Sequence, residues 1–214
     1  MKIKSNKKPL LIIGSGGHFK SCLDVIEESK IFYVYGLISK IDKIGSKICG
    51  YKVLSQSDNY KKFYKLGIRN AFIAVGQIKN SDKRKKIFYN LKKSNFDLPS
   101  FVSKTSKLSK NVKIGEGSII HKICHIGRDV QIGKCNIINT ASIIEHDCSI
   151  GSHVHICPGA VISGGCTVGD GTFIGAGATI MQEINIGKCV TVAAGAVVVK
   201  DVPDRSMVKG VPAT

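Results

Sequence analysis

His146 stands between two carboxylates, Glu145 and Asp147, and is well placed in the sequence to move a proton at neutral pH. A histidine side chain has a reference pKa of ~6.5, so it can take a proton from an attacking amine or hydroxyl group. A carboxylate beside it can fix the tautomer of the ring and stabilise its protonated form. Asp147 is the shorter of the two candidate partners and Glu145 competes with it. A solvated surface histidine is the alternative interpretation.

The other histidines and the cysteines predict no metal site. His121, His125 and His153 show none of the ligand spacings of known zinc sites, and the eight cysteines contain no CxxC pair. The apolar run Pro9–Ile13, which follows a basic N-terminus, is too short for a signal peptide, and no apolar stretch is long enough to span a membrane. We therefore expect reduced, buried thiols in a cytoplasmic protein without membrane insertion.

A glycine-rich turn, Gly14-Ser15-Gly16-Gly17-His18, lies between a predicted buried strand at Leu10–Ile13 and a predicted helix at Phe19–Ser29. Main-chain N–H groups at the start of a helix suit phosphate groups. The motif is not a full GxGxxG, so it does not predict a dinucleotide site. A tight turn without a ligand is the alternative.

Further strands and helices alternate after this turn. Strands are predicted at Phe32–Ile38 and Phe72–Val75, and a helix at Ser81–Lys93 with Ser81 as its N-cap. Alternating strands and helices indicate a small domain with a parallel sheet. We assign residues 1–101 to a Rossmann-like α/β domain.

The second half of the chain is an internal repeat of six residues. Every sixth residue from Val102 to Val198 is Val, Leu or Ile, without an insertion, and a glycine often follows it. A period of six fits neither an amphipathic helix nor a single strand. It is typical of a parallel β-helix in which three short strands make a triangular coil of about 18 residues. Residues 102–214 are therefore assigned to a β-helix with a C-terminal tail, in which Cys148 and Cys166 stack inside, one coil apart.

The excess of positive charge lies in the first half. Residues 1–101 hold 21 basic and 7 acidic residues, whereas residues 102–214 hold 11 and 8. Only four of the basic residues are arginines, and arginine is the side chain that reads bases and binds phosphates in a bidentate way. We expect a lysine-rich solvated surface that also attracts an anionic small substrate, and no nucleic-acid partner.

The repeat resembles the left-handed β-helix of the hexapeptide acyltransferases, and the Gly210-Val211-Pro212-Ala213 ending recurs in that superfamily. The two-part layout resembles one branch of it, the NeuD/PglD-type sugar acyltransferases. This branch is typified by the UDP-4-amino-sugar N-acetyltransferase of bacillosamine synthesis and by the sialic acid O-acetyltransferases. The resemblance implies a left-handed helix, a homotrimer, and acetyl-CoA bound as co-substrate between neighbouring subunits, with no metal.

The resemblance also implies roles for individual residues. His146 matches the general base and Asp147 the adjacent carboxylate, within a segment that begins at Asn139. His155 matches a position that contacts acetyl-CoA and, across the trimer interface, approaches His146 of the next chain. The remaining matches divide into acetyl-CoA contacts at Gly164, Ala176 and Ala194, and substrate contacts at Gly14, Ser15, Gly16, Gly17, His18, Ser39 and Asn139.

One departure from the branch concerns the nucleotide base. Acidic residues commonly follow the second strand and reach the uracil, whereas this chain has Ser39-Lys40, with Asp42 two residues on. The resemblance implies acetyl-CoA-dependent N-acetylation of the 4-amino group of a UDP-4-amino-4,6-dideoxy sugar, in the synthesis of surface glycans or glycoproteins. O-acetylation of sialic acid or a related sugar is the alternative, and a non-catalytic β-helix scaffold is a third possibility.

Overall fold

The computed structural model of the chain describes residues 7–78 and 80–214, so most of the basic N-terminal stretch lies outside the described residues. The chain forms two compact units. One contains the chain up to Gly76 together with Lys86–Pro99, and the other contains Gln77–Lys85 and Ser100–Thr214. Sequence analysis assigned Gln77–Lys85 to the first domain, but this segment bonds to residues of the second unit, as described below. No helix in the described ranges is long and apolar enough to cross a membrane.

The first unit is built around a five-stranded sheet with the order β3-β4-β2-β1-β5. Its strands are β1 (Lys8–Ile13), β2 (Phe32–Ile38), β3 (Lys47–Ile48), β4 (Tyr51–Ser55) and β5 (Asn70–Ile73). All neighbouring pairs are parallel except β3–β4. The helices are α1 (Gly17–Ile26), α2 (Lys61–Lys65) and α3 (Asp82–Lys93). The predicted parallel α/β fold is confirmed, whereas β3, β4 and α2 were not predicted.

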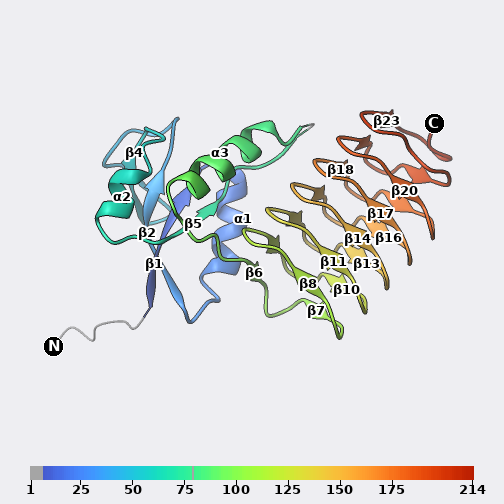
Figure 1. The fold of residues 1–214 in the computed structure, drawn as a ribbon, viewed down its shortest axis with the longest axis horizontal. Helices are drawn as coiled ribbons and strands as arrows, with labels where there is room; N and C mark the ends of the chain where they lie inside the picture. Colours follow the sequence, from blue (N-terminus) through green and yellow to red (C-terminus); the bar gives the residue numbers. More distant parts are fainter. Residues whose placement is uncertain (1–6, 79) are drawn as a thin grey trace. The chain divides into compact units, whose positions relative to one another are not determined.

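The second unit is a left-handed parallel β-helix, as predicted, and its coils follow one another from β6 to β23 (Figure 1). Its strands form three sheets, which we call faces. The β7–β22 face contains β7 (Lys107–Leu108), β10 (His125–Ile126), β13 (Ile143–Ile144), β16 (Val161–Ile162), β19 (Thr179–Ile180) and β22 (Val197–Val198). The β8–β20 face contains β8 (Lys113–Ile114), β11 (Gln131–Ile132), β14 (Ser149–Ile150), β17 (Thr167–Val168) and β20 (Asn185–Ile186). The β6–β23 face contains β6 (Phe101–Val102), β9 (Ile119–Ile120), β12 (Ile137–Ile138), β15 (His155–Ile156), β18 (Phe173–Ile174), β21 (Thr191–Val192) and β23 (Met207–Val208).

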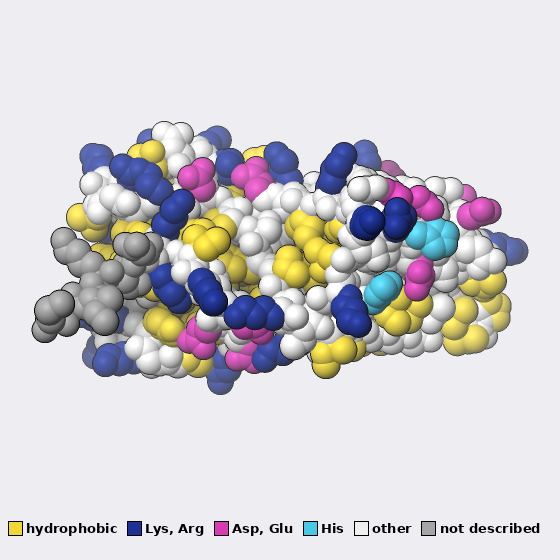
Figure 2. All heavy atoms as spheres, turned by 90° about the horizontal axis from the view of Figure 1, so that it is seen from below, with side chains coloured by type: hydrophobic (Ala, Val, Ile, Leu, Met, Phe, Trp, Pro, Cys, Tyr) yellow, Lys and Arg dark blue, Asp and Glu magenta, His cyan; other side chains and the backbone are white. Residues whose placement is uncertain are grey.

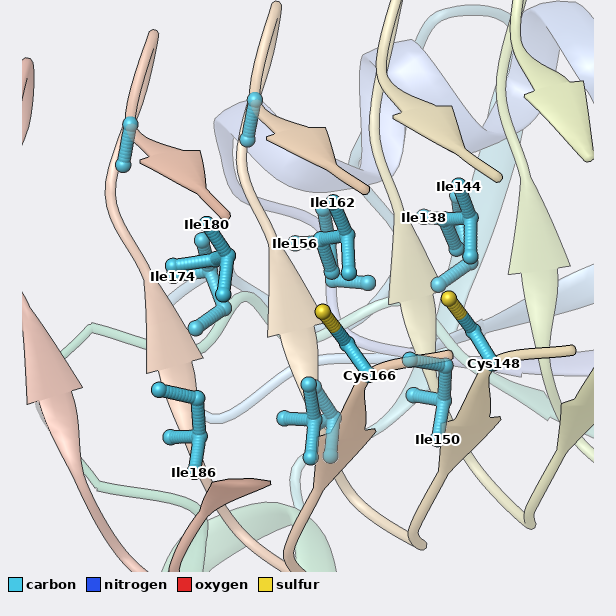
Figure 3. Close-up of a cluster of buried hydrophobic side chains, with 14 of the residues drawn as sticks. Ile138, Ile144, Cys148, Ile150, Ile156, Ile162, Cys166, Ile174, Ile180 and Ile186 are labelled. Carbon is cyan, nitrogen blue, oxygen red and sulfur yellow. The ribbon is translucent and has the colours of Figure 1, made fainter. Parts of the chain in front are cut away.

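From Ile120 to Val198 the aliphatic residue of each hexad points into the β-helix, whereas Val102 and Leu108 at its open first coil, which the repeat predicted to point inward as well, are exposed. Strands up to β22 pair in register with an offset of 18 residues, so Ile144 lies beside Ile162 and Ile150 beside Val168, whereas β21 and β23 pair with an offset of 16. These side chains are fully or almost fully buried and form a continuous ladder (Figure 3). Because each coil adds inward aliphatic groups to the same column, burial of apolar area stabilises the stack along its whole length.

The cysteines of the interior also satisfy main-chain carbonyl groups. Cys148 and Cys166 occupy equivalent places in successive coils and point inward (Figure 3). Cys148 Sγ donates to the Ser163 carbonyl oxygen at 3.1 Å, and Cys166 Sγ donates to that of Met181 at 3.0 Å. Because buried carbonyl groups need donors, these thiols act as small structural residues.

The corners of the coils need an unusual backbone conformation. Every sixth residue from Asn111 to Gly195 has a positive φ, between 55° and 74°. Glycine adopts this conformation without steric cost, and Asn and Asp tolerate it. Corners at equivalent places in successive coils line up into three edges. We name each edge by one of its residues: the His146 edge, the Ala176 edge and the His153 edge. The strands of the three faces run between them.

The side of the molecule drawn in Figure 2 shows no continuous stripe of basic side chains among the described residues. On this side, Lys and Arg side chains are dispersed among neutral atoms and acidic groups. This arrangement agrees with the expected lysine-rich solvated surface.

Candidate active site

His146 and Asp147 form a hydrogen-bonded pair at one corner of the β-helix. His146 Nδ1 lies 2.8 Å from Asp147 Oδ2, and both side chains are well exposed. Asp147 adopts a positive φ of 60°, and its side chain lies beside the ring of the preceding residue. An ionised carboxylate only accepts, so Nδ1 carries the proton and Nε2 is left with its lone pair. Asp147, and not Glu145, makes the hydrogen bond to the ring.

The carboxylates around His146 favour its protonated form. The hydrogen bond from Asp147 is the main cause that raises the pKa of His146 above its ordinary value, and the charges of Asp147 and Glu145 add to it. Partial desolvation acts in the opposite direction. A base with a raised pKa holds an abstracted proton more strongly, which suits general-base catalysis near neutral pH.

Gly164 lies directly below the His146 ring, one coil further along the same edge. A Cβ atom at Gly164 would lie 2.7 Å from both Cε1 and Nε2 of His146, closer than side chains tolerate. The main-chain N–H of Gly165 also donates to the His146 carbonyl oxygen at 2.9 Å. The ring can therefore take this position only because residue 164 has no side chain.

Ala176 and Ala194 lie on a different edge from Gly164. Both are exposed and belong to the Ala176 edge, where Gly177 and Gly195 adopt positive φ values. A Cβ at either of these glycines would meet no atom within 4 Å. This edge therefore offers open space beside small side chains, but strand β13 separates it from His146 within one subunit.

His155 and Asn139 lie on the β6–β23 face, close to the Ala176 edge. His155 is almost fully buried, and its Nδ1 lies 2.8 Å from the main-chain oxygen of Gln77. Burial lowers the pKa of His155 to about 4, so its ring is neutral at physiological pH. Its Nε2 lies 3.4 Å from Asn139 Nδ2. Gln77 was missed by sequence analysis because it is 78 residues away and carries no motif.

The glycine-rich turn of the first unit lies at the carboxyl end of β1, as predicted. Gly14 has a φ of 110°, and a Cβ there would lie 2.8 Å from the Ala74 carbonyl oxygen, so the turn requires glycine. Gly16 and Gly17 are exposed at the start of α1. His18 is half-buried, with Nε2 3.3 Å from Cys22 Sγ on the next helical turn.

Ser15, Ser39 and Asp42 form a hydrogen-bonded cluster beside this turn. The Ser15 and Ser39 hydroxyl groups are 2.6 Å apart, and both donate to Asp42 Oδ2, that of Ser39 at 2.8 Å. These hydrogen bonds, first that of Ser15 and then that of Ser39, lower the pKa of the Asp42 carboxyl group. Asp42, in the loop that follows β2, thus brings a carboxylate beside the glycine-rich turn.

The structure therefore groups the predicted residues into three places. His146, Asp147 and Gly164 meet at one edge, and Asn139 and His155 meet near another, which also carries Ala176 and Ala194. Gly14, Ser15, Gly16, Gly17, His18 and Ser39 lie in the first unit.

The chain is similar to several known proteins. The family model described as the PglD N-terminal domain matches residues 9–91. WeeI from Acinetobacter baumannii AYE is 30% identical, with a TM-score of 0.83, and the match covers 97% of this chain and 99% of that chain. The chain belongs to the hexapeptide-repeat sugar acetyltransferases.

Two further solved structures agree with this membership. The acetyltransferase domain of PglB from Neisseria gonorrhoeae FA1090, in complex with acetyl coenzyme A, is 29% identical with a TM-score of 0.87, over 97% of this acetyltransferase and 98% of that chain. A mutant of perosamine N-acetyltransferase from Caulobacter crescentus, in complex with CoA and GDP-perosamine, is 28% identical with a TM-score of 0.89, over 96% and 95%. No curated protein sequence matches significantly. The predicted family and enzyme class, an acetyl-CoA-dependent sugar acetyltransferase, are confirmed.

Proposed function

We propose that this enzyme transfers the acetyl group of acetyl-CoA to the 4-amino group of a UDP-4-amino-4,6-dideoxy sugar in the cytoplasm, as a step in surface-glycan or glycoprotein sugar synthesis. The observation that carries the proposal is the His146–Asp147 pair packed over Gly164 in a chain of this family. The similar N-acetyltransferase bound to CoA and GDP-perosamine supports N-acetylation of a nucleotide sugar over O-acetylation of sialic acid.

His146 is the general base of the proposed reaction. Its Nδ1 proton is held by Asp147, so Nε2 takes a proton from the sugar amine as the nitrogen attacks the thioester carbonyl carbon. A nitrogen–carbon bond forms, and the tetrahedral intermediate collapses as the carbon–sulfur bond breaks. The proton on His146 then passes to the leaving CoA sulfur. Asp147 orients the ring and stabilises the imidazolium, and no covalent enzyme intermediate is needed.

We propose that the acetyl-CoA site forms between neighbouring subunits of a homotrimer. Gly164 lies beside the base, whereas His155, Ala176 and Ala194 lie on or near the Ala176 edge of the same chain. A neighbouring copy that sets its Ala176 edge against the His146 edge would bring the two groups together. The β7–β22 face between these edges supports association, because its half-buried outward side chains include Ile143, Val161 and Val197. The outward residues of the β8–β20 face are instead polar and exposed, namely Lys113, Gln131, Ser149, Thr167 and Asn185.

We place the nucleotide at the glycine-rich turn and the Ser15–Ser39–Asp42 cluster. The phosphates would accept main-chain N–H groups of Gly16, Gly17 and His18 at the start of α1. All the hydrogen bonds described for the Asp42 carboxylate go to Oδ2, which leaves Oδ1 for a ligand. A single available carboxylate oxygen suits the one N–H group on the pairing edge of uracil better than the two N–H groups on that edge of guanine. This match favours UDP.

The test is release of thiol from acetyl-CoA with three acceptors: a UDP-4-amino-4,6-dideoxy sugar, its GDP-linked counterpart and free sialic acid. We expect rapid release only with the UDP-linked amine. Release only with the GDP-linked sugar would overturn the choice of base. Release only with sialic acid would move the assignment to O-acetylation.

The role of the base is tested with His146→Ala. Loss of a general base should lower kcat by at least about 100-fold. The matched control is Gln182→Ala, an exposed side chain two coils further along the same edge. An undiminished rate of His146→Ala, with the assembly intact, would remove the mechanism.

A further inference from the structure

Gln77 is a buried residue that connects Gln77–Lys85 to the face that carries His155. Its side chain is 2% exposed, and its Nε2 donates to the His153 carbonyl oxygen at 3.1 Å. Arg84, at the other end of this segment, is also buried and donates to the Cys135 carbonyl oxygen at 3.0 Å. Two buried side chains thus fix the segment, and with it the main-chain oxygen of Gln77, against the β-helix.

The main-chain oxygen of Gln77 determines the tautomer of His155. A carbonyl oxygen only accepts, so the nitrogen 2.8 Å from it, Nδ1, must carry the proton. The ring is neutral, so Nε2 carries a lone pair and only accepts, and both Asn139 Nδ2 at 3.4 Å and Cys157 Sγ at 3.7 Å lie near it. Phe173 packs edge-on against the ring at 5.3 Å and restricts its rotation.

His155 and Thr140 in turn determine which way the Asn139 amide group faces. The Thr140 main-chain N–H donates to Asn139 Oδ1 at 2.9 Å, which identifies the oxygen. Asn139 Nδ2 therefore faces His155 Nε2, and one of its two protons is shared with that nitrogen at 3.4 Å. The second proton has no acceptor among the described residues, and the side chain is half-buried. Towards a ligand, the Nδ2 end of Asn139 can only donate.

We propose that Gln77 and His155 are positioning residues that hold Asn139 as a hydrogen-bond donor to the thioester carbonyl oxygen of acetyl-CoA. This inference rests on the proposed function, because Asn139 precedes the corner residues of the Ala176 edge, where we place acetyl-CoA. Negative charge develops on that oxygen when the amine attacks, and a fixed donor stabilises it. The sugar amine is a poorer partner, since a donor would occupy the lone pair that must attack.

The first experiment separates binding from catalysis. Asn139→Ala should lower kcat by about 100-fold or more while KM for acetyl-CoA changes little, as for other oxyanion donors. Gln131→Ala, an exposed residue on the β8–β20 face, is the control and should match the parent enzyme. A fall in kcat/KM caused only by a higher KM would overturn the assignment, because it would indicate uniform binding.

The second experiment tests the positioning residues with two isosteres. In His155→Asn, the amide keeps an N–H donor near the place of Nδ1, which can still reach the main-chain oxygen of Gln77, but the acceptor at the place of Nε2 is lost. In His155→Gln, the longer side chain places an amide oxygen near the place of Nε2. We expect His155→Gln to retain at least about fivefold more kcat than His155→Asn, because orienting Asn139 is the catalytic requirement. Equal rates of the two variants would overturn the role of His155. Gln77→Ala should lower kcat without changing the pH profile.

Infrared difference spectra of carbonyl-labelled acetyl-CoA distinguish failure of this inference from failure of the proposed function. In the parent enzyme the thioester carbonyl stretch should shift to lower frequency on binding, and in Asn139→Ala this shift should be lost. The same frequency in both proteins, with acetyl-CoA bound, would overturn this inference alone. Absence of acetyl-CoA binding to the parent enzyme by calorimetry would overturn the proposed function, and this inference with it.

Discussion

Replacement of Gly164 by alanine should damage catalysis without damaging the fold. The added Cβ would lie 2.7 Å from Cε1 and Nε2 of His146, whereas ordinary contacts begin at 3.4 Å, so the ring must move by about 0.7 Å. A misplacement of about 1 Å at a reacting group can cost about 100-fold in rate. We therefore expect kcat to fall between about 10- and 100-fold. The fold should persist, because the ring is exposed and Gly164 does not adopt a left-handed φ.

The assay is steady-state thiol release, with thermal unfolding and light scattering to verify fold and assembly. A double-mutant cycle with His146→Ala decides whether Gly164 acts through the ring. In the His146→Ala background the alanine at position 164 should have no further effect. A tenfold loss that persists in that background, or a parent-like rate of Gly164→Ala, would refute the explanation by steric displacement of His146.

Three further outcomes are expected. Asp147→Asn should move the acidic limb of the kcat/KM–pH profile to lower pH, because the Asp147 carboxylate raises the pKa of His146 and the base is active only above that pKa. If the limb does not move, another group is responsible for it. Val161→Glu should dissociate the assembly in light scattering, because it places a charge on the apolar β7–β22 face, whereas Thr167→Glu on the polar face should not. Ile162→Ala should lower the free energy of unfolding in urea by about 2–5 kcal/mol, because its side chain is fully buried; a change below about 1 kcal/mol would contradict the packed ladder.

The β-helix was predictable because its period leaves little choice. A hydrophobic residue at every sixth position from Val102 to Val198 is typical of one repeat architecture, and this architecture buries the members from Ile120 to Val198. The α/β unit was predictable in outline from strand β1 and the turn at Gly14. The short elements β3, β4 and α2 have no comparable pattern, because tertiary packing and not local periodicity stabilises elements of this length.

The contacts of the candidate site were less accessible to sequence analysis. Asp147 adopts a positive φ of 60° and lies beside the His146 ring, and the sequence does not show which of the two neighbouring carboxylates turns toward the ring. The relation of Gln77 to His155 depends on tertiary folding across 78 residues. The cluster of Asp42 with Ser15 needs the path of the loop after β2, which no local rule provides.

The offset of 18 residues between the paired strands up to β22 restricts how the length of this part of the chain can change during evolution. Each coil contacts only its neighbours, so loss or gain of one whole coil leaves every edge aligned. A change of six residues between His146 and Gly164 would instead rotate all later corners by one third of a turn and place a residue of another edge beneath the imidazole. Tolerated insertions and deletions in this domain should therefore come as whole coils or as loops that leave a corner and return to it.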